Sequence, residues 1–403
     1  MIKNTLYIFA GRISNAVFLF LLTLVVTRQL GPASFGVFSF LTTVVMAASC
    51  FANLGLDTWM VREVTKSTER GRYYLSNILG LKTGASLITI SLISLAFNST
   101  DLPDTTQSLL WVIMVSVLFN SLSQTLWHYG NCFKQFIYHS SLWATSNIIK
   151  SFLGITLVLL YRELEPLVWG IVIAEAATLF ISFIVIRNRF GNSMPEFNFL
   201  VWKEFLSSSG PMAFGMIFSV LYFRLDIVML QMMTEEKIVG WYSAAYRLFE
   251  ITLILPHSFM LVLFPTLVEE YHTDRSKFKK SFQKAVEMFS IIGGGVAVGL
   301  WFFCDGIITL IYGEKFFPSI GVLNILAPAV FLFFINFLLS NILIASGREK
   351  INVWNLVIAT IINILLNLTL IPEYGAEGAA WATVFCEGAL VVVMSLQIRK
   401  GHE

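Results

Sequence analysis

The residues whose types and spacing best suit chemistry are four charged side chains in two neighbouring apolar segments. Arg224 and Asp226 lie in one segment, and Arg247 and Glu250 lie in the next. If the first segment crosses a membrane outward and the second inward, Arg224 lies about six and Arg247 about eight residues from the outer edge, hence at similar depth for a rise of ~1.5 Å per residue. Charges within a membrane are costly and usually functional, so we expect a charge cluster here.

Two interpretations of this cluster remain open. Arginine binds anionic groups such as phosphates through two parallel hydrogen bonds, which would make Arg224 and Arg247 an anion site. Arg247 and Glu250 are three residues apart and share a helix face. The alternative is therefore a pair of intramembrane ion pairs that hold two helices together without any ligand.

A second set of charges lies elsewhere in the chain. Lys150 and Glu175 fall at similar depth in adjacent apolar segments and are predicted to pair. Glu387 repeats Glu175 in the second half of the chain, but its neighbouring segment carries amides in place of a base: Asn355, Asn363 and Asn367. A carboxylate without a cation can stay protonated or exchange protons. Glu175 and Glu387 are thus candidates for ion or proton coupling, although packing polarity is the simpler interpretation.

Three more charges lie nearer the segment ends. Arg12 is about a third of the way across the first segment at ~1.5 Å per residue, where it could contact an anion, pair with acids of the second half, or extend to the interface. Asp57 is close to Arg62 and is predicted to form an interfacial pair or a helix cap, with gating as the alternative. Lys82 lies one turn inside its segment and is predicted to extend toward water.

The composition places these residues in a membrane. Of 403 residues, 56% are hydrophobic and 13% charged, and the mean hydropathy is +0.75, whereas soluble domains carry about 25% charged residues. This excludes soluble enzymes, nucleic-acid binders and disordered scaffolds. The net charge of +2 does not indicate a nucleic-acid partner. The four cysteines are far apart in sequence, so neither a zinc site nor a disulfide framework is expected. We expect no other metal and no cofactor.

Twelve apolar runs approach the ~20 residues that a helix needs to cross a bilayer. Because backbone groups in lipid must satisfy their own hydrogen bonds, the runs are predicted to be helices. They lie near residues 4–27, 37–56, 78–97, 108–130, 140–160, 167–187, 205–230, 239–267, 282–303, 320–345, 353–371 and 378–399. The sequence therefore predicts an all-α polytopic membrane protein with twelve transmembrane helices.

Basic residues in the connections predict the orientation. With the N-terminus inside, eighteen Lys and Arg fall on the cytoplasmic side and four on the external side, as expected from the excess of positive charge in cytoplasmic loops. Both termini are therefore expected in the cytoplasm. The first span is longer than a cleavable signal and has no cleavage site at its end, so we expect it to remain as a helix.

An internal repeat predicts two lobes. Three residues near the end of the first half recur 212 positions later: Trp169, Glu175 and Arg187 match Trp381, Glu387 and Arg399. Because each half holds an even number of spans, both run in the same sense across the membrane. We expect two pseudo-symmetric six-helix bundles, residues 1–190 and 205–403, around a central cleft, joined by a cytoplasmic linker at residues 191–204. Rocking of one bundle against the other suits a transporter, although a duplication need not imply transport.

Small residues and prolines within the spans suggest bending points. Pro256 and Pro328 lie inside apolar runs, and Gly293, Gly294, Gly295 and Gly299 lie in another. Proline removes a helix hydrogen bond, so bending during transport is one interpretation. For the glycines, close packing between helices is an equal alternative.

Four segments, in this order along the chain, resemble motifs of the Wzx-type O-antigen and polysaccharide flippases of the multidrug/oligosaccharidyl-lipid/polysaccharide exporter superfamily. They are residues 30–39 (LGPASFGVFS), 55–63 (GLDTWMVRE), 239–248 (VGWYSAAYRL) and 374–383 (YGAEGAAWAT). The resemblance implies an inner-membrane flippase that moves an undecaprenyl-pyrophosphate-linked oligosaccharide to the external leaflet. The partners that it implies are membrane lipids, a polysaccharide polymerase and a chain-length regulator.

With such a substrate, the charged residues divide into two groups. Those expected to contact the pyrophosphate or the glycan are basic: Arg12, Lys150, Arg224 and Arg247. Those expected to serve ion coupling or gating are acidic: Asp57, Glu175, Asp226, Glu250 and Glu387.

Three other functions remain as alternatives. A drug or cation exporter of the same superfamily would favour a cleft dominated by carboxylates, whereas arginines mildly favour an anion. A flippase for another lipid-linked precursor is also possible, but the peptidoglycan flippases of this superfamily have fourteen helices. A membrane-embedded glycan polymerase would need a large external loop, and no phosphate-binding loop or zinc-protease motif is present. We therefore expect a transporter that is not an enzyme and does not hydrolyse ATP.

Overall fold

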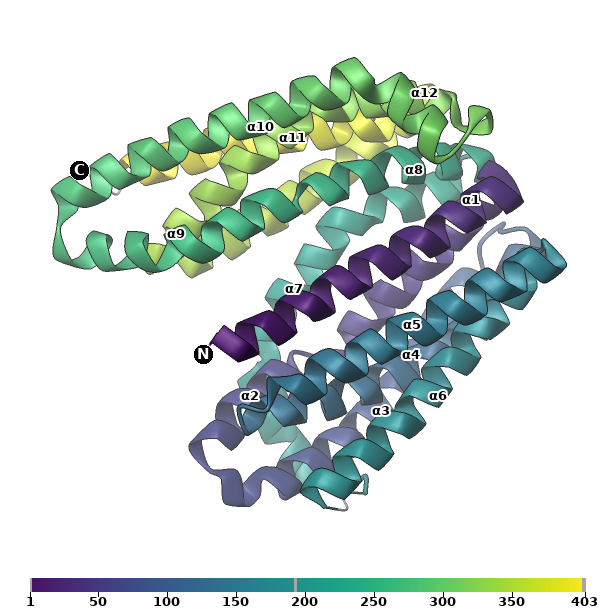
Figure 1. The fold of residues 1–403 in the computed structure, drawn as a ribbon, viewed down its shortest axis with the longest axis vertical. Coiled ribbons are helices and arrows are strands. Elements are labelled where there is room, and N and C mark those ends of the chain that lie inside the picture. Colours follow the sequence, from purple (N-terminus) through teal and green to yellow (C-terminus); the bar gives the residue numbers. More distant parts are fainter. Residues whose placement is uncertain (1, 192–193, 401–403) are drawn as a thin grey trace. The chain divides into compact units, whose positions relative to one another are not determined.

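The computed structural model describes the backbone of residues 2–191 and 194–400, and the side chains of residues 17–191, 194–210 and 212–399. Within this part every regular element is a helix (Figure 1). The helices are α1 (Ile2–Asn53), α2 (Leu56–Lys66), α3 (Gly71–Asn98), α4 (Asp104–Cys132), α5 (Phe136–Tyr161), α6 (Leu164–Phe190), α7 (Phe199–Met233), α8 (Glu236–Thr252), α9 (Ile254–Thr273), α10 (Arg275–Ile311), α11 (Pro318–Ala345) and α12 (Glu349–Lys400), with 3₁₀ turns at Thr68–Arg70 and Glu314–Phe316.

The predicted all-helical, apolar architecture is confirmed, while the number of twelve spans stays a prediction. Among the described residues, ten helical stretches are long and apolar enough to cross a membrane. Two of them contain glycine kinks, at Gly31 (φ 81°) in α1 and at Gly375 (φ 56°) in α12. Glycine adopts positive φ without a steric penalty. Four predicted spans lie in pairs on the two sides of these kinks: 4–27 and 37–56, and 353–371 and 378–399.

The break between α8 and α9 has a local cause. Helix α8 ends at Thr252 and α9 begins at Ile254, within the single run predicted over residues 239–267. Pro256 follows four residues after Thr252 and cannot donate a hydrogen bond to its carbonyl group, so the helix cannot continue regularly. Pro328, by contrast, lies inside a continuous α11.

The chain divides into two compact units, residues 1–220 and 221–403. In the first unit, α2, α3 and the start of α7 meet at a buried aromatic cluster, where the ring centroids of Trp59 and Phe205 are 4.6 Å apart. In the second unit, α11 packs against α8, α9, α10 and α12. Gly293 of α10 allows close packing there, because a Cβ atom would lie 2.9 Å from Phe334 of α11. At Gly293 the packing interpretation is therefore the supported one.

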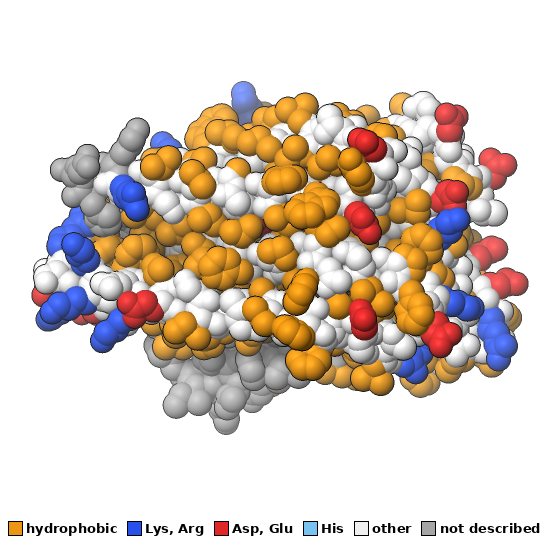
Figure 2. Space-filling view, turned by 90° about the horizontal axis from the view of Figure 1, so that it is seen from above, with side chains coloured by type: hydrophobic (Ala, Val, Ile, Leu, Met, Phe, Trp, Pro, Cys, Tyr) orange, Lys and Arg blue, Asp and Glu red, His pale blue; other side chains and the backbone are white. Residues whose placement is uncertain are grey.

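Large apolar side chains are exposed on the outer helix faces. Leu160, Val262, Phe302 and Leu310 are each at least 70% exposed. Figure 2 shows one face on which hydrophobic side chains form a broad band, with Lys and Arg gathered toward its ends. A soluble protein rarely exposes so much contiguous apolar surface, whereas lipid-facing helices require it.

Candidate functional site

The predicted cluster at α7 and α8 forms, with one acid between two bases. Arg224 Nη2 and Glu250 Oε1 make a direct ion pair at 2.6 Å, and Arg247 Nη1 lies 3.6 Å from Glu250 Oε2. The three side chains are about one fifth exposed. Because a single carboxylate faces two guanidinium groups, the cluster keeps one net positive charge. It can therefore attract an anion in addition to holding the helices.

The prediction that Asp226 belongs to this cluster is wrong. Arg224 and Asp226 are two residues apart on α7, so they point about 200° apart around the helix axis. Asp226 is 2% exposed and accepts hydrogen bonds from neutral groups: Tyr242 Oη at 2.8 Å, Asn367 Nδ2 at 2.7 Å and Thr383 Oγ1 at 3.2 Å. No ion pair to Asp226 occurs among the described side chains.

Glu387 also lacks a cationic partner, as predicted, but its amide partner differs from the predicted ones. Its Oε1 accepts from Tyr222 Oη at 2.7 Å, and its Oε2 accepts from Asn336 Nδ2 at 2.7 Å. Of the amides in the neighbouring span, Asn367 bonds to Asp226 and to Asn363, and Asn355 bonds to Gln397. One spacing in the sequence, which the predictions did not use, places Tyr222 and Asp226 together. The two residues are four apart, so both lie on one face of α7.

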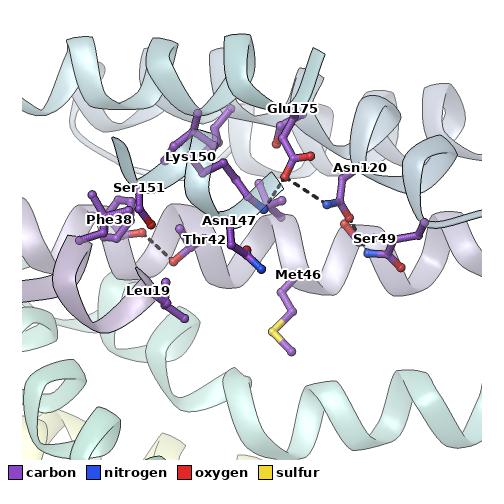
Figure 3. Close-up of a pocket in the computed structure, with 16 residues that line it drawn as sticks. Leu19, Phe38, Thr42, Met46, Ser49, Asn120, Asn147, Lys150, Ser151 and Glu175 are labelled. Carbon is purple, nitrogen blue, oxygen red and sulfur yellow. Dashed lines mark hydrogen bonds and ion pairs between the residues drawn. The ribbon is translucent and has the colours of Figure 1, made fainter. Parts of the chain in front are cut away.

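The predicted pairing of Lys150 with Glu175 is confirmed. Lys150 Nζ of α5 lies 3.0 Å from Glu175 Oε1 of α6. Asn120 Nδ2 of α4 donates to the same oxygen at 3.1 Å, and Gln124 Nε2 donates to Asn120 Oδ1 at 2.6 Å. These four side chains line a cavity of about 330 Å³ inside the first unit (Figure 3).

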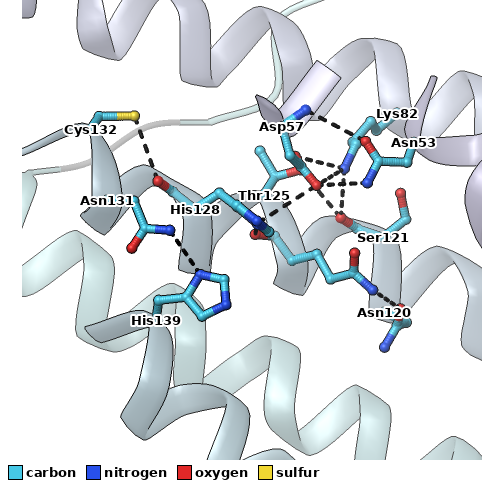
Figure 4. Close-up of polar contacts among 11 residues, drawn as sticks. Asn53, Asp57, Lys82, Asn120, Ser121, Thr125, His128, Asn131, Cys132 and His139 are labelled. Carbon is cyan, nitrogen blue, oxygen red and sulfur yellow. Dashed lines mark hydrogen bonds and ion pairs between the residues drawn. The ribbon is translucent and has the colours of Figure 1, made fainter. Parts of the chain in front are cut away.

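The predictions for Asp57 and Lys82 are wrong in their partners. Lys82 is fully buried and donates to both carboxylate oxygens of Asp57 at 2.8 Å, and to the carbonyl oxygen of Ser121 at 3.2 Å (Figure 4). It faces the interior of the unit, so it cannot extend to the interface. Arg62 instead pairs with its neighbour Glu63 at 3.0 Å.

Further polar groups complete the Asp57 cluster. Asn53 Nδ2 and Thr125 Oγ1 donate to Asp57 at 2.9 and 2.8 Å, and His128 Nδ1 lies 3.9 Å from its Oδ2. Sequence reasoning missed the histidine, which stacks edge-on against His139. Together these contacts connect α2, α3 and α4. The remaining candidate, Arg12, lies outside the described side chains.

Comparison with known proteins places the chain in a family. Residues 1–271 match the model of the family described as polysaccharide biosynthesis protein. The chain belongs to this family. Residues 211–369 also match the MatE model. Both matches confirm the predicted membership of the exporter superfamily, in its polysaccharide branch.

Two curated relatives cover nearly the whole chain. A probable low-salt glycan biosynthesis flippase of Haloferax volcanii, Agl15, is 22% identical over 94% of this chain and 80% of its own length. The capsular polysaccharide biosynthesis protein CapF of Staphylococcus aureus is also 22% identical, over 94% of both chains.

Solved structures support the fold. The lipid II flippase MurJ in an inward closed conformation has a TM-score of 0.76 at 18% identity, covering 99% of this chain and 88% of that one. An inward-facing multidrug resistance MATE transporter has a TM-score of 0.70 at 14% identity, covering 96% and 95%. With the ten apolar stretches, these similarities identify a multi-pass membrane protein.

Proposed function

We propose that the chain is a flippase that carries a lipid-linked oligosaccharide, with undecaprenyl pyrophosphate as the carrier, across the inner membrane. Its relatives are named for glycan and capsule biosynthesis, and its fold is that of transporters. The supporting observation in the chain itself is the sharing of Glu250 between Arg224 and Arg247.

The arginine cluster suits the diphosphate of such a carrier. Guanidinium groups bind phosphate oxygens through paired hydrogen bonds and stay charged at any physiological pH. Glu250 keeps the two arginines side by side on α7 and α8 when no anion is present. A diphosphate can then take over part of their hydrogen bonding, and the net positive charge of the cluster offsets one of its two negative charges.

The mechanism that we propose is alternating access between two six-helix lobes, residues 1–190 and 205–403, with residues 191–204 as the linker and both termini in the cytoplasm. Asp226 and Glu387 would couple transport to an ion or proton gradient, because their buried carboxylates have only neutral partners among the described side chains. Asp57 would instead hold the inner ends of α2, α3 and α4 together. A polysaccharide polymerase and a chain-length regulator would act on the exported unit.

A drug or cation exporter is the second candidate, because a MATE transporter shares the fold. A cation would be repelled by the surplus positive charge at Arg224 and Arg247. A membrane-embedded polymerase is disfavoured by short connections, such as the two residues between α5 and α6.

Substitution of the arginines tests the proposal in cells that depend on this chain for surface polysaccharide. Arg224→Ala and Arg247→Ala should abolish surface glycan and cause lipid-linked units to accumulate inside, at normal protein level. Arg62→Ala is the matched control, because Arg62 is exposed and, among the described side chains, pairs only with its neighbour Glu63. Normal surface glycan in both arginine variants would contradict the proposal.

A further inference from the structure

The cavity of the first unit combines a polar side with an apolar one. Its lining comes from α1, α4, α5 and α6. Figure 3 shows Lys150, Asn120 and Glu175 on the upper side of the view, with Leu19 and Met46 below them. Cavities of about 300 Å³ are at the small end of ligand sites, so the volume is enough for one small ring, and Leu19 and Met46 lie exposed at its open side.

Two polar atoms in this wall are buried and lack any hydrogen-bond partner in the part of the chain that is described. They are a donor, Asn147 Nδ2, and an acceptor, Glu175 Oε2. Their residues are only 8% and 4% exposed. A buried polar atom without a partner costs about 1–3 kcal/mol, so the wall favours an occupant that both donates and accepts. A hydroxyl group does both.

The charge of the wall selects against an ionic occupant. Lys150 and Glu175 neutralise each other at 3.0 Å, and they are the only charged residues that line the cavity among those described. The described contacts use one of the three N–H donors of Lys150, which leaves two for an acceptor. A carboxylated ligand would bring its charge next to Glu175, whereas a neutral ring of hydroxyl groups would not.

We propose that this cavity binds one neutral pyranose of the glycan that is transported, which rests on the proposed flippase function. Asn147 and Lys150 donate to ring hydroxyl oxygens, and Glu175 Oε2 accepts from a hydroxyl. The apolar C–H face of the ring packs against Leu19 and Met46. The cavity thus recognises the sugar, separately from the arginines that bind the diphosphate.

Binding to the purified full-length protein tests the proposal. Saturation-transfer NMR with methyl glucoside, methyl galactoside and N-acetylglucosamine should show saturable binding of at least one, with glucuronate weaker. Asn147→Leu, which removes a donor, and Ser49→Leu, which fills the cavity, should each weaken binding about tenfold, the loss expected for a hydrogen bond. Asn341→Leu is the matched control, because the described hydrogen bond of this amide is to the carbonyl oxygen of Phe337 in its own helix α11.

Three results would overturn the proposal. The first is that no neutral probe binds, and the second is that the Asn147→Leu and Ser49→Leu variants bind as strongly as the wild type. The third is that glucuronate binds more strongly than the neutral probes. Glucose linked to farnesyl diphosphate should displace methyl glucoside, and failure to do so would show that a free sugar, not the lipid-linked glycan, occupies the cavity.

An experiment in cells distinguishes failure of the sugar site from failure of the flippase function. If deletion of the chain leaves surface polysaccharide intact, the function itself is wrong. If deletion removes it and Asn147→Leu fully restores it, only the sugar site is wrong.

Discussion

The partner of each buried carboxylate decides what that residue can do. Asp57 and Glu175 each have a lysine within 3.0 Å that compensates the carboxylate charge, so they serve structure or recognition. Asp226 and Glu387 have tyrosine, threonine or asparagine partners instead. Burial of an anion among neutral groups is unfavourable unless a cation or proton accompanies it. We therefore expect gradient coupling at the second pair and not at the first.

Removing the charge at Asp226 or Glu387 should uncouple transport from the gradient. Asp226→Asn and Glu387→Gln keep side-chain size, so we expect folded protein whose uptake no longer responds to an imposed Na⁺ or proton gradient. The measurement is transport into proteoliposomes with and without each gradient. Glu373→Gln is the control, because Glu373 is an exposed residue of the same helix as Glu387. A full gradient response in both test variants would disprove their role.

The geometry of the arginines should matter as well as their charge. Lysine keeps the charge but lacks the planar fork of five donors. We expect Arg224→Lys and Arg247→Lys to retain part of the surface glycan that the alanine variants lose. Quantification of surface polysaccharide at matched protein level checks this. If the lysine variants are as inactive as alanine, charge alone contributes nothing, and if they are fully active, paired hydrogen bonds are unnecessary.

At the scale of helices, the buried Asp57–Lys82 pair connects α2 to α3, and Thr125 adds α4. Removing one member of a buried pair leaves the other charge without compensation. This typically lowers the free energy of unfolding by about 3–5 kcal/mol, which is among the largest effects of a single substitution. Replacing both members removes that cost. The loss of stability therefore depends on whether one member of the pair or both members are replaced.

Lys82→Met should lower stability by about 3–5 kcal/mol, and the double variant Lys82→Met with Asp57→Leu should recover most of it. Unfolding of the purified protein by a denaturing detergent, followed by circular dichroism, measures the difference. Lys66→Met is a suitable control, because Lys66 is exposed and its ion pair within the described part of the chain is with Glu63 of its own helix. A double variant as unstable as the single one would show that the buried ion pair is not the reason for the loss.

The start of α10 depends on a cap. Asp274 accepts hydrogen bonds from the backbone N–H groups of Ser276 and Lys277. These bonds, of which that from Lys277 has the largest effect, hold the pKa of Asp274 below its usual range. Since the folded-state pKa is the lower one, the stabilisation is present above the unfolded pKa of about 4. It is lost as the pH falls through the folded value.

Asp274→Ala should therefore lower the melting temperature at pH 7 and have less effect near pH 3. Asp274→Asn keeps a cap acceptor and should lower the melting temperature less at pH 7. Thermal unfolding at the two pH values checks this. An equal loss for Asp274→Ala at both values would mean that the carboxylate charge is irrelevant at this helix start.

Helix positions followed from the sequence more readily than side-chain partners. Apolar run length placed most of the helices that hold the charged residues, because lipid demands continuous helical hydrogen bonding. It did not place α2, which holds Asp57 and begins where the run predicted over residues 37–56 ends. Depth counting also predicted that Lys150 meets Glu175. It failed for Lys82 and Asp226 because depth says nothing about rotation around the helix axis. Rotation is set by packing between helices, such as that which turns Lys82 toward Asp57.

At the scale of the whole molecule, the two glutamates that the predicted repeat matches have different partners in the two units. Glu175 and Glu387 occupy repeated positions, yet Glu175 faces Lys150 beside a cavity and Glu387 faces Tyr222 and Asn336. We infer a division of work, with sugar recognition in the first unit and coupling in the second. We propose that the arginine cluster of the second unit supplies the contact to the diphosphate.

Transport by the purified protein tests the central claim most directly. Proteoliposomes would carry a fluorescent sugar on a polyprenyl diphosphate, and a membrane-impermeant quencher would report which leaflet holds it. We predict that the wild-type protein moves the lipid between leaflets and that the Arg224→Ala, Arg247→Ala double variant does not, while Arg62→Ala does. Equal movement with the wild type, the double variant and protein-free vesicles would contradict the account.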